Sequence, residues 1–261
     1  MLGGIDPYGG ACAIRDGART YPSNPLTAIV VALPFSPFGY LGALVMWACF
    51  VGVLVFGILT SAKSWRLLIL TAAPFWESFW LLQWAPLITA IVFVPSILPL
   101  AMVKPHIGLP VMLTNLTRRR IAACAAFAAL TLVIDPSWPF RWWPQAMNFD
   151  GFVPVAVPVA GTLLLGLLVF LALLNARDSR TQFLLLAALM PQRGFYDALP
   201  LTTISGSAPQ LFAWSVLSWL GFFAGQARHD LYPQCVVMFL YLPLVLRLIV
   251  EALHVRQHRA H

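Results

Sequence analysis

The sequence predicts an all-α fold, a polytopic membrane helix bundle of about eight spans in which several helices are broken or re-entrant. Of the 261 residues, 60% are hydrophobic and only 10% are charged, whereas a soluble domain carries about 25% charged residues. The apolar residues form runs of the kind that cross a bilayer. Prolines interrupt many of these runs, and a broken helix survives at membrane depth only where protein or a water-filled cavity covers its backbone.

The N-terminal segment 1–38 is expected to be an external loop followed by a short interfacial helix at 26–34. It is polar, rich in Gly and then in Pro, and it lacks the basic start and apolar core of a signal peptide. Residues 39–255 are expected to form the helix bundle, and 256–261 a basic cytoplasmic tail. The chain 1–261 is therefore predicted to be a single transmembrane domain.

The apolar runs give the expected helices in chain order. Several are shorter than the roughly 20 residues that a span needs, so half-helices around a cavity are expected. Straight spans that proline merely kinks are the alternative. The runs cover residues 40–61, 67–82, 84–102, 121–134, 152–174, 182–191, 195–206, 210–226 and 231–253.

Lys and Arg predict which loops face the cytoplasm. The segment Asp135–Asp150 holds three Trp and one Arg, so it is expected to be an external loop with aromatic anchors. The segment 105–117 would span about 20 Å as a helix, too little for a bilayer of about 30 Å. It is therefore expected to be one arm of a re-entrant hairpin. The predicted cytoplasmic positions are Lys63 and Arg66, Arg118 to Arg120, Arg177 and Arg180, and Arg256 and Arg259.

Asp197 is the acidic residue most suggestive of a site. It lies in MPQRGFYDALPL, between two apolar runs, with Arg193 and Tyr196 close by. These side chains are expected to meet near the external mouth of the bundle, and an ionisable residue at membrane depth is by default a functional hypothesis. The alternative is a tight loop closed by an ion pair between Arg193 and Asp197.

Lys104 and His106 lie between two further apolar segments. A buried Lys could hold a phosphate group as a point charge, and the alternative is a Lys that snorkels to the cytoplasmic surface. Glu77 and Gln83 flank a Trp-rich turn that is predicted to be external. An interfacial aromatic belt with a few polar residues is the simpler interpretation there.

Several function classes have no support in the sequence. The four Cys are far apart and form no CxxC pair, which favours small buried apolar residues over a zinc site or a disulfide framework. No HExxH, P-loop or GxSxG motif is present. The net charge of +7 is typical of loop charges that set orientation, and no basic stripe with interleaved aromatics indicates nucleic acid. No metal is predicted, and the cofactor is left open.

Three parts of the sequence together resemble one known family. They are GGIDPYGGA with RTYPSNPLTAIVVALPFSPFGYLGALVMW, then LLQWAPLITAIVFV with AMVKPHIGLPVMLTNLTRRR, and finally MPQRGFYDALPL. This pattern resembles the polyprenyl-phosphate-mannose-dependent mannosyltransferases, glycosyltransferase family 87 of the C-type glycosyltransferase superfamily. The family's catalytic base normally precedes the first motif. The resemblance therefore implies that this chain lacks the N-terminal helix and the base region.

The resemblance implies a multi-helix enzyme with its site on the external face and a lipid-linked sugar as donor. A carboxylate would act as general base on the acceptor hydroxyl, and cations would stabilise the departing phosphate. On this basis the candidate catalytic residues are Asp197 and Asp6, and the candidate substrate-binding residues are Arg193, Tyr196, Lys104, His106 and Tyr21.

The expected function is transfer of a sugar from a polyprenyl-phosphate donor to a lipid or glycan acceptor outside the cytoplasm. The expected surroundings are membrane lipids, with a bacterial inner membrane as the location. The alternative is a catalytically inactive relative that serves as a scaffold or accessory subunit of a membrane complex, with other subunits as partners. A transporter is a third interpretation, although no inverted repeat is visible.

Overall fold

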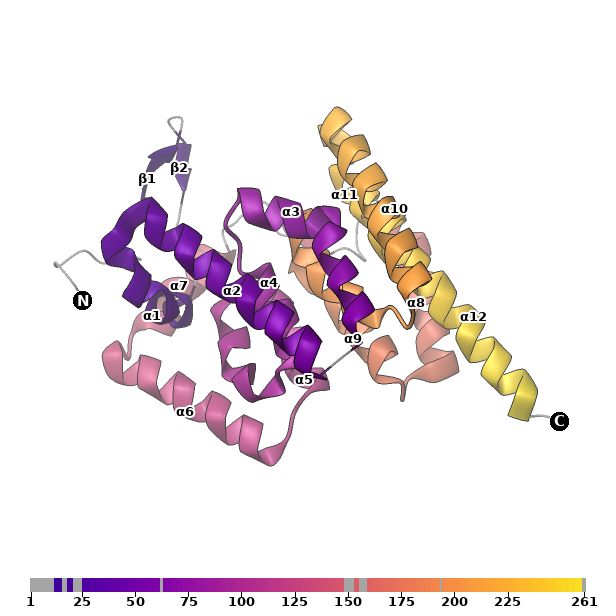
Figure 1. Ribbon diagram of the computed structural model, residues 1–261, viewed down its shortest axis with the longest axis horizontal. Coiled ribbons are helices and arrows are strands. Elements are labelled where there is room, and N and C mark those ends of the chain that lie inside the picture. Colours follow the sequence, from indigo (N-terminus) through magenta and orange to yellow (C-terminus); the bar gives the residue numbers. More distant parts are fainter. Residues whose placement is uncertain are drawn as a thin grey trace.

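The fold is all-α, as predicted: in the computed structural model the described chain is helical apart from two short antiparallel strand pairs (Figure 1). Strand β1 (Cys12–Arg15) pairs with β2 (Ala18–Thr20), and β3 (Val153–Pro154) pairs with β4 (Pro191–Gln192). The structure describes residues 12–15, 18–20, 25–61, 63–147, 153–154, 159–192 and 194–259.

Most of the α-helices are short. Prolines explain much of this, because proline suits the first turn of a helix, where its missing N–H would be unpaired anyway. Pro74, Pro86 and Pro105 each stand in such a first turn, which confirms that prolines break the apolar runs. The α-helices are α1 (Leu26–Ala32), α2 (Gly39–Ser61), α3 (Ala73–Trp80), α4 (Ala85–Phe93), α5 (Pro105–Thr114), α6 (Arg118–Ile134), α7 (Trp138–Met147), α8 (Val159–Asn175), α9 (Ser179–Leu189), α10 (Ala208–Ala227), α11 (Tyr232–Val236) and α12 (Leu242–Arg259).

Short segments of 3₁₀ helix and one of π-helix connect the α-helices. Most are 3₁₀ helices, which use i→i+3 hydrogen bonds and are often connectors. One is a π-helix inside the last long helical segment. The connecting segments are η2 (Leu33–Phe38), η3 (Ser64–Thr71), η4 (Pro95–Val103), η5 (Phe195–Ile204), η6 (His229–Leu231) and the π-helical η7 (Val237–Tyr241).

The core lies around α4 and η5. Both consist mainly of apolar residues, and a helix that is apolar over most of its surface is buried within the protein or the membrane. Every residue of α4 from Ala85 to Ile91 is buried, and so is every residue of η5 except Thr203. The two segments pack against each other, and α2 covers α4 (Figure 1). This packing fixes the position of the first turn of η5, which carries Asp197.

The helix α5 turns back and packs along η4, so the two segments form the expected hairpin around 105–117. A Cβ at Gly108 would lie only 2.0 Å from the carbonyl oxygen of Ala101. Only glycine permits two backbones to approach this closely. The position of this hairpin relative to a membrane stays a prediction.

Two helical segments of the described chain are long and apolar enough to cross a membrane, Leu26–Ser61 and His229–His258. A third is added if Arg118–Ile134 and Trp138–Pro144, which meet at 94°, count as one broken span. This composition is compatible with a membrane protein. The expected count of about eight spans is not confirmed, because most other apolar runs form shorter helices, and α10, with 20 residues, is not among the helices apolar enough to cross a membrane.

Two segments expected as a loop and a tail are helical, while their placement relative to a membrane stays a prediction. The described part of the segment expected as an external loop, Asp135–Met147, is mostly the helix α7. Its aromatic rings are spaced as neighbours on a helix, with the ring centroids of Trp138 and Trp142 5.9 Å apart. The expected tail is also helical, since α12 continues to Arg259.

The four basic segments lie at one end of the bundle, as predicted. The carbonyl oxygen of Asn115 accepts a hydrogen bond from Arg120, and Asn115 lines the same pocket as Arg180. Arg256, near the end of α12, donates to the carbonyl oxygens of Leu173 and Leu174, near the end of α8. Lys63 and Arg66 line a second pocket, which shares Thr203 with the first. That this end faces the cytoplasm stays a prediction.

Candidate functional site

The candidate functional site is a buried polar cluster where several broken helices begin or end. Glu77 comes from α3, and Lys104 stands at the break between η4 and α5. Asp197 lies in the first turn of η5, and Tyr232 is the first residue of α11. Helix ends carry backbone groups without intrahelical partners. Polar side chains therefore gather where apolar helices are interrupted.

Lys104 and Asp197 form the centre of the cluster. Lys104 Nζ lies 2.7 Å from Asp197 Oδ1, and the two side chains are 2% and 0% exposed. The other carboxylate oxygen, Oδ2, lies 3.3 Å from Nε2 of His106. Lys104 also donates to Oε1 of Gln83 at 3.1 Å and lies 4.2 Å from the centroid of the Tyr196 ring. The Lys104 ammonium thus has a carboxylate, an amide oxygen and an aromatic face around it.

Glu77 is held by neutral donors. The hydroxyl of Tyr232 donates to Glu77 Oε1 at 2.8 Å, and the backbone N–H of Tyr196 donates to Oε2 at 2.5 Å. The Tyr232 hydroxyl in turn accepts the N–H of Phe195 at 3.1 Å. Among the described residues no ion pair to Glu77 is formed. Glu77 therefore tethers the first turn of η5, and with it Asp197, to α3 and α11.

The cluster is closed on most sides. A small pocket of about 10 Å³, lined by His106 and Asp197 together with apolar residues of α5, α9 and η5, adjoins it. This is about the space that one water molecule needs. The arrangement can hold charge and pass a proton between Asp197 and His106, because their side chains are within hydrogen-bonding distance.

The structure brings together four of the predicted site residues, Lys104, His106, Tyr196 and Asp197. Lys104 does not snorkel to the surface, since it is 2% exposed. The other three predicted residues, Asp6, Tyr21 and Arg193, lie outside the described residues.

Sequence reasoning missed three members of the cluster, Glu77, Gln83 and Tyr232. The Glu77 side chain is buried and hydrogen-bonded inside the protein, whereas Trp76 and Trp80 beside it are exposed, so the aromatic belt stays a prediction. An acidic residue within a Trp- and Phe-rich run was the signal that could have found it. Tyr232 carried no comparable signal, because it follows an ordinary charged loop.

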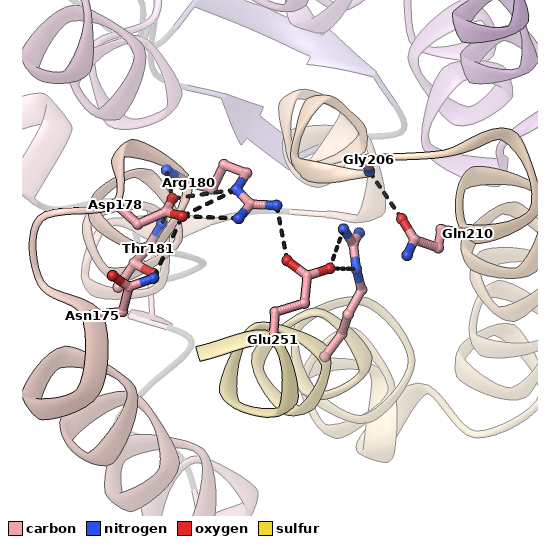
Figure 2. A network of polar contacts seen from close by, with 8 residues as sticks. Asn175, Asp178, Arg180, Thr181, Gly206, Gln210 and Glu251 are labelled. Atoms are coloured by element: carbon pink, nitrogen blue, oxygen red, sulfur yellow. Dashed lines mark hydrogen bonds and ion pairs between the residues drawn. The ribbon is translucent and has the colours of Figure 1, made fainter. Parts of the chain in front are cut away.

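Two further acidic residues of the described chain, Asp178 and Glu251, form ion pairs. Asp178 pairs with Arg180, and Arg180 also contacts Glu251 from α12 (Figure 2). Asp178 caps α9 by accepting the N–H groups of Arg180 and Thr181. Burial alone raises the pKa of the Asp178 carboxyl, but the hydrogen bonds and charge of Arg180 outweigh burial and lower that pKa. Glu251 also forms an i,i+4 pair with Arg247.

No protein-family model matches this chain, and no significant match was found among curated proteins or solved structures. Among the described residues, no three His, Cys, Asp or Glu side chains are grouped so that they could hold a metal ion. The polar cluster and the sequence are therefore the features from which a function can be inferred.

Proposed function

We propose that the chain is a membrane glycosyltransferase that moves a sugar, mannose in the first instance, from a polyprenyl-phosphate donor to a lipid or glycan acceptor. The observation that supports this proposal is the meeting of Lys104, His106 and Asp197. Lys104 and His106 are 93 and 91 positions from Asp197 in the sequence. They belong to one, and Asp197 to another, of the segments in which the sequence resembles family 87 glycosyltransferases.

The three side chains supply the groups that such a reaction needs. Asp197 and His106 form a carboxylate–imidazole pair that would accept the proton of the acceptor hydroxyl. Lys104 places a positive charge where negative charge develops on the leaving phosphate. The departing polyprenyl phosphate is a good leaving group, so one base and one cation suffice for a direct displacement.

We place the protein in a bacterial inner membrane with about eight spans, some of them built from pairs of short helices. Apolar side chains point away from the bundle along α8, where Leu163 is 62% exposed and Leu173 is 75% exposed. Such side chains are costly in water and suit contact with lipid. The polar cluster would then lie at membrane depth, where ionisable residues are rare and functional by default.

Turnover of a defined donor tests this function. The purified chain in phosphatidylcholine nanodiscs is incubated with polyprenyl-phosphate-mannose and a lipid or glycan acceptor, and mass spectrometry follows release of polyprenyl phosphate together with formation of the mannosylated acceptor. Asp197→Asn is expected to lower the rate by about 10² to 10⁴-fold, the usual worth of a general base. The matched control is Asp230→Asn, because Asp230 pairs with Arg228 and is 63% exposed. Equal rates in both variants would contradict the proposal.

A second candidate function is that of a non-catalytic subunit that stabilises a membrane complex. The observation that favours it is the closure of the cluster: the Asp197 side chain is 0% exposed, and the adjoining pocket has about 10 Å³. A folded protein that releases no polyprenyl phosphate, with Asp197→Asn leaving the cellular phenotype unchanged, would support this second candidate and exclude the first.

A further inference from the structure

A second polar pocket lies at the basic end of the bundle and plays no part in the proposed reaction. Its volume is about 350 Å³, and it lies between the end of α2, the segment η3 and the link from η5 to α10. Lys63 and Arg66 line it together with the hydroxyl-bearing residues Ser61 and Thr203. None of the described residues that line it is acidic. The pocket therefore favours an anion.

Arg66 is positioned in this pocket with donors to spare. Its guanidinium carbon lies 4.8 Å from the centroid of the Trp65 ring and 5.7 Å from that of Phe93. Its Nη1 donates to the carbonyl oxygen of Thr203 at 3.0 Å. This is the one hydrogen bond of the Arg66 side chain within the described residues, and a guanidinium has five N–H donors. A planar group fixed in this way is suited to bind phosphate oxygens.

A third cationic group, a guanidinium paired with a carboxylate, lies beside the pocket at Gly206. A Cβ at Gly206 would lie 2.9 Å from Nη2 of Arg247, so that guanidinium is next to the pocket. Arg247 Nη1 and the hydroxyl of Ser205 are buried without a hydrogen-bond partner. Glu251 engages both Arg247 and Arg180, and Figure 2 shows Glu251 reaching Arg180 near Gly206. Lys63 and Arg66 have no such carboxylate in the described chain.

The position of the pocket along the chain indicates where the anion comes from. Lys63 is two residues beyond Ser61, the last residue of the candidate span Leu26–Ser61. The end of a span lies at the level of the lipid headgroups, where Trp side chains are also enriched. Trp65 and Phe93 line the same pocket. They would provide an apolar wall beside the charges.

We propose that this pocket binds a phosphate group, held by Lys63 and Arg66, and that the group belongs to an anionic phospholipid of the leaflet at the basic end of the bundle. Basic pockets between helices at this level are suited to acidic headgroups. The site is separate from the Lys104–Asp197 cluster. It therefore stands whether or not the protein transfers sugars.

Lipid exchange into nanodiscs tests the site. The chain is reconstituted in phosphatidylcholine with increasing phosphatidylglycerol, and bound lipid is counted by native mass spectrometry. Lys63→Gln and Arg66→Gln are each expected to weaken phosphatidylglycerol binding about fivefold, and the double variant by more than tenfold. Arg119→Gln is the matched control, because Arg119 is exposed at the start of α6 and lines neither pocket. It should change binding less than twofold.

A parallel arm uses inorganic phosphate in pure phosphatidylcholine discs. Binding of phosphatidylglycerol but not of inorganic phosphate supports the lipid as the source. Binding of both, with the same dependence on Lys63, supports the phosphate site and identifies a soluble anion as a second source. Lys63→Gln removes an exposed side chain, so loss of fold does not complicate its result. Equal phosphatidylglycerol binding by the wild type and by Lys63→Gln would overturn the proposal.

Discussion

Two ion pairs of similar length lie in contrasting regions of this molecule. Lys104 and Asp197 are 2.7 Å apart with side chains 2% and 0% exposed, whereas Arg180 and Glu251 are 3.0 Å apart with side chains 38% and 35% exposed. The first pair lies inside the protein, and the second lies at its partly exposed surface. The distance between two charges therefore does not by itself give the energy of an ion pair. The surroundings decide how much is lost when one partner is removed.

Removing one charge of the buried pair should have the largest effect. Lys104→Met keeps the shape of the side chain but leaves Asp197 without its ammonium partner. Loss of one partner of a buried pair costs about 3–5 kcal/mol of the free energy of unfolding. Denaturant titration in mixed micelles, followed by circular dichroism, measures the loss.

The matched control for that experiment removes both charges. Lys104→Met combined with Asp197→Leu should recover at least half of the lost stability, because two apolar groups of similar volume replace a pair that no longer requires desolvation. A double variant that is less stable than Lys104→Met alone would show that Asp197 is held by something other than its charge pairing.

A loss of stability of intermediate size is expected when the Tyr232 hydroxyl is removed from the core. Tyr232→Phe removes the hydroxyl that donates to Glu77 and accepts from the Phe195 N–H. Two buried polar groups then lose a partner, which should cost about 1–3 kcal/mol. Thermal unfolding of the variant measures this, and Tyr40→Phe is the control because Tyr40 is 73% exposed. Equal shifts for the two variants would argue that the Glu77 cluster does not stabilise the fold.

The smallest effect is expected at the basic end. Glu251→Gln removes the carboxylate shared by Arg180 and Arg247, yet exposed pairs contribute only about 0–1 kcal/mol. Whatever is lost should disappear in about 1 M salt, where charges are screened beyond about 3 Å. The same unfolding titration at low and high salt checks this. A loss of stability that persists at high salt would show that the Glu251 carboxylate, like that of Asp197, is protected from solvent.

Much of the architecture could be predicted because it depends on local chemistry. Prolines at helix starts, apolar runs and clustered Arg residues each leave a mark in the sequence itself. They predicted short helices and a single basic end, and both are present. The helix α7 could not be separated from an aromatic loop by composition, because Trp and Pro are common in both.

The candidate site was predictable only in part. Lys104, His106, Tyr196 and Asp197 stood out because charged and polar groups are rare in apolar sequence. The pairing of these residues could not be predicted, since Lys104 and Asp197 are 93 positions apart in the sequence. Only the packing of η5 against α3 and α4 brings these side chains together. The same holds for Tyr232, whose bond to Glu77 joins residues 155 positions apart.

The distance along the chain between Lys104 and Asp197 also has a consequence for biosynthesis. A ribosome adds roughly 5 to 20 residues per second, so Lys104 emerges roughly 5 to 20 s before the carboxylate that neutralises it. During that interval its ammonium group must stay near water or near an oxygen atom that has already been made. Gln83, which precedes it and accepts its hydrogen bond in the finished structure, is such a partner. Of the two side-chain oxygen partners of Lys104 described above, Gln83 is therefore the one that already exists when Lys104 is made.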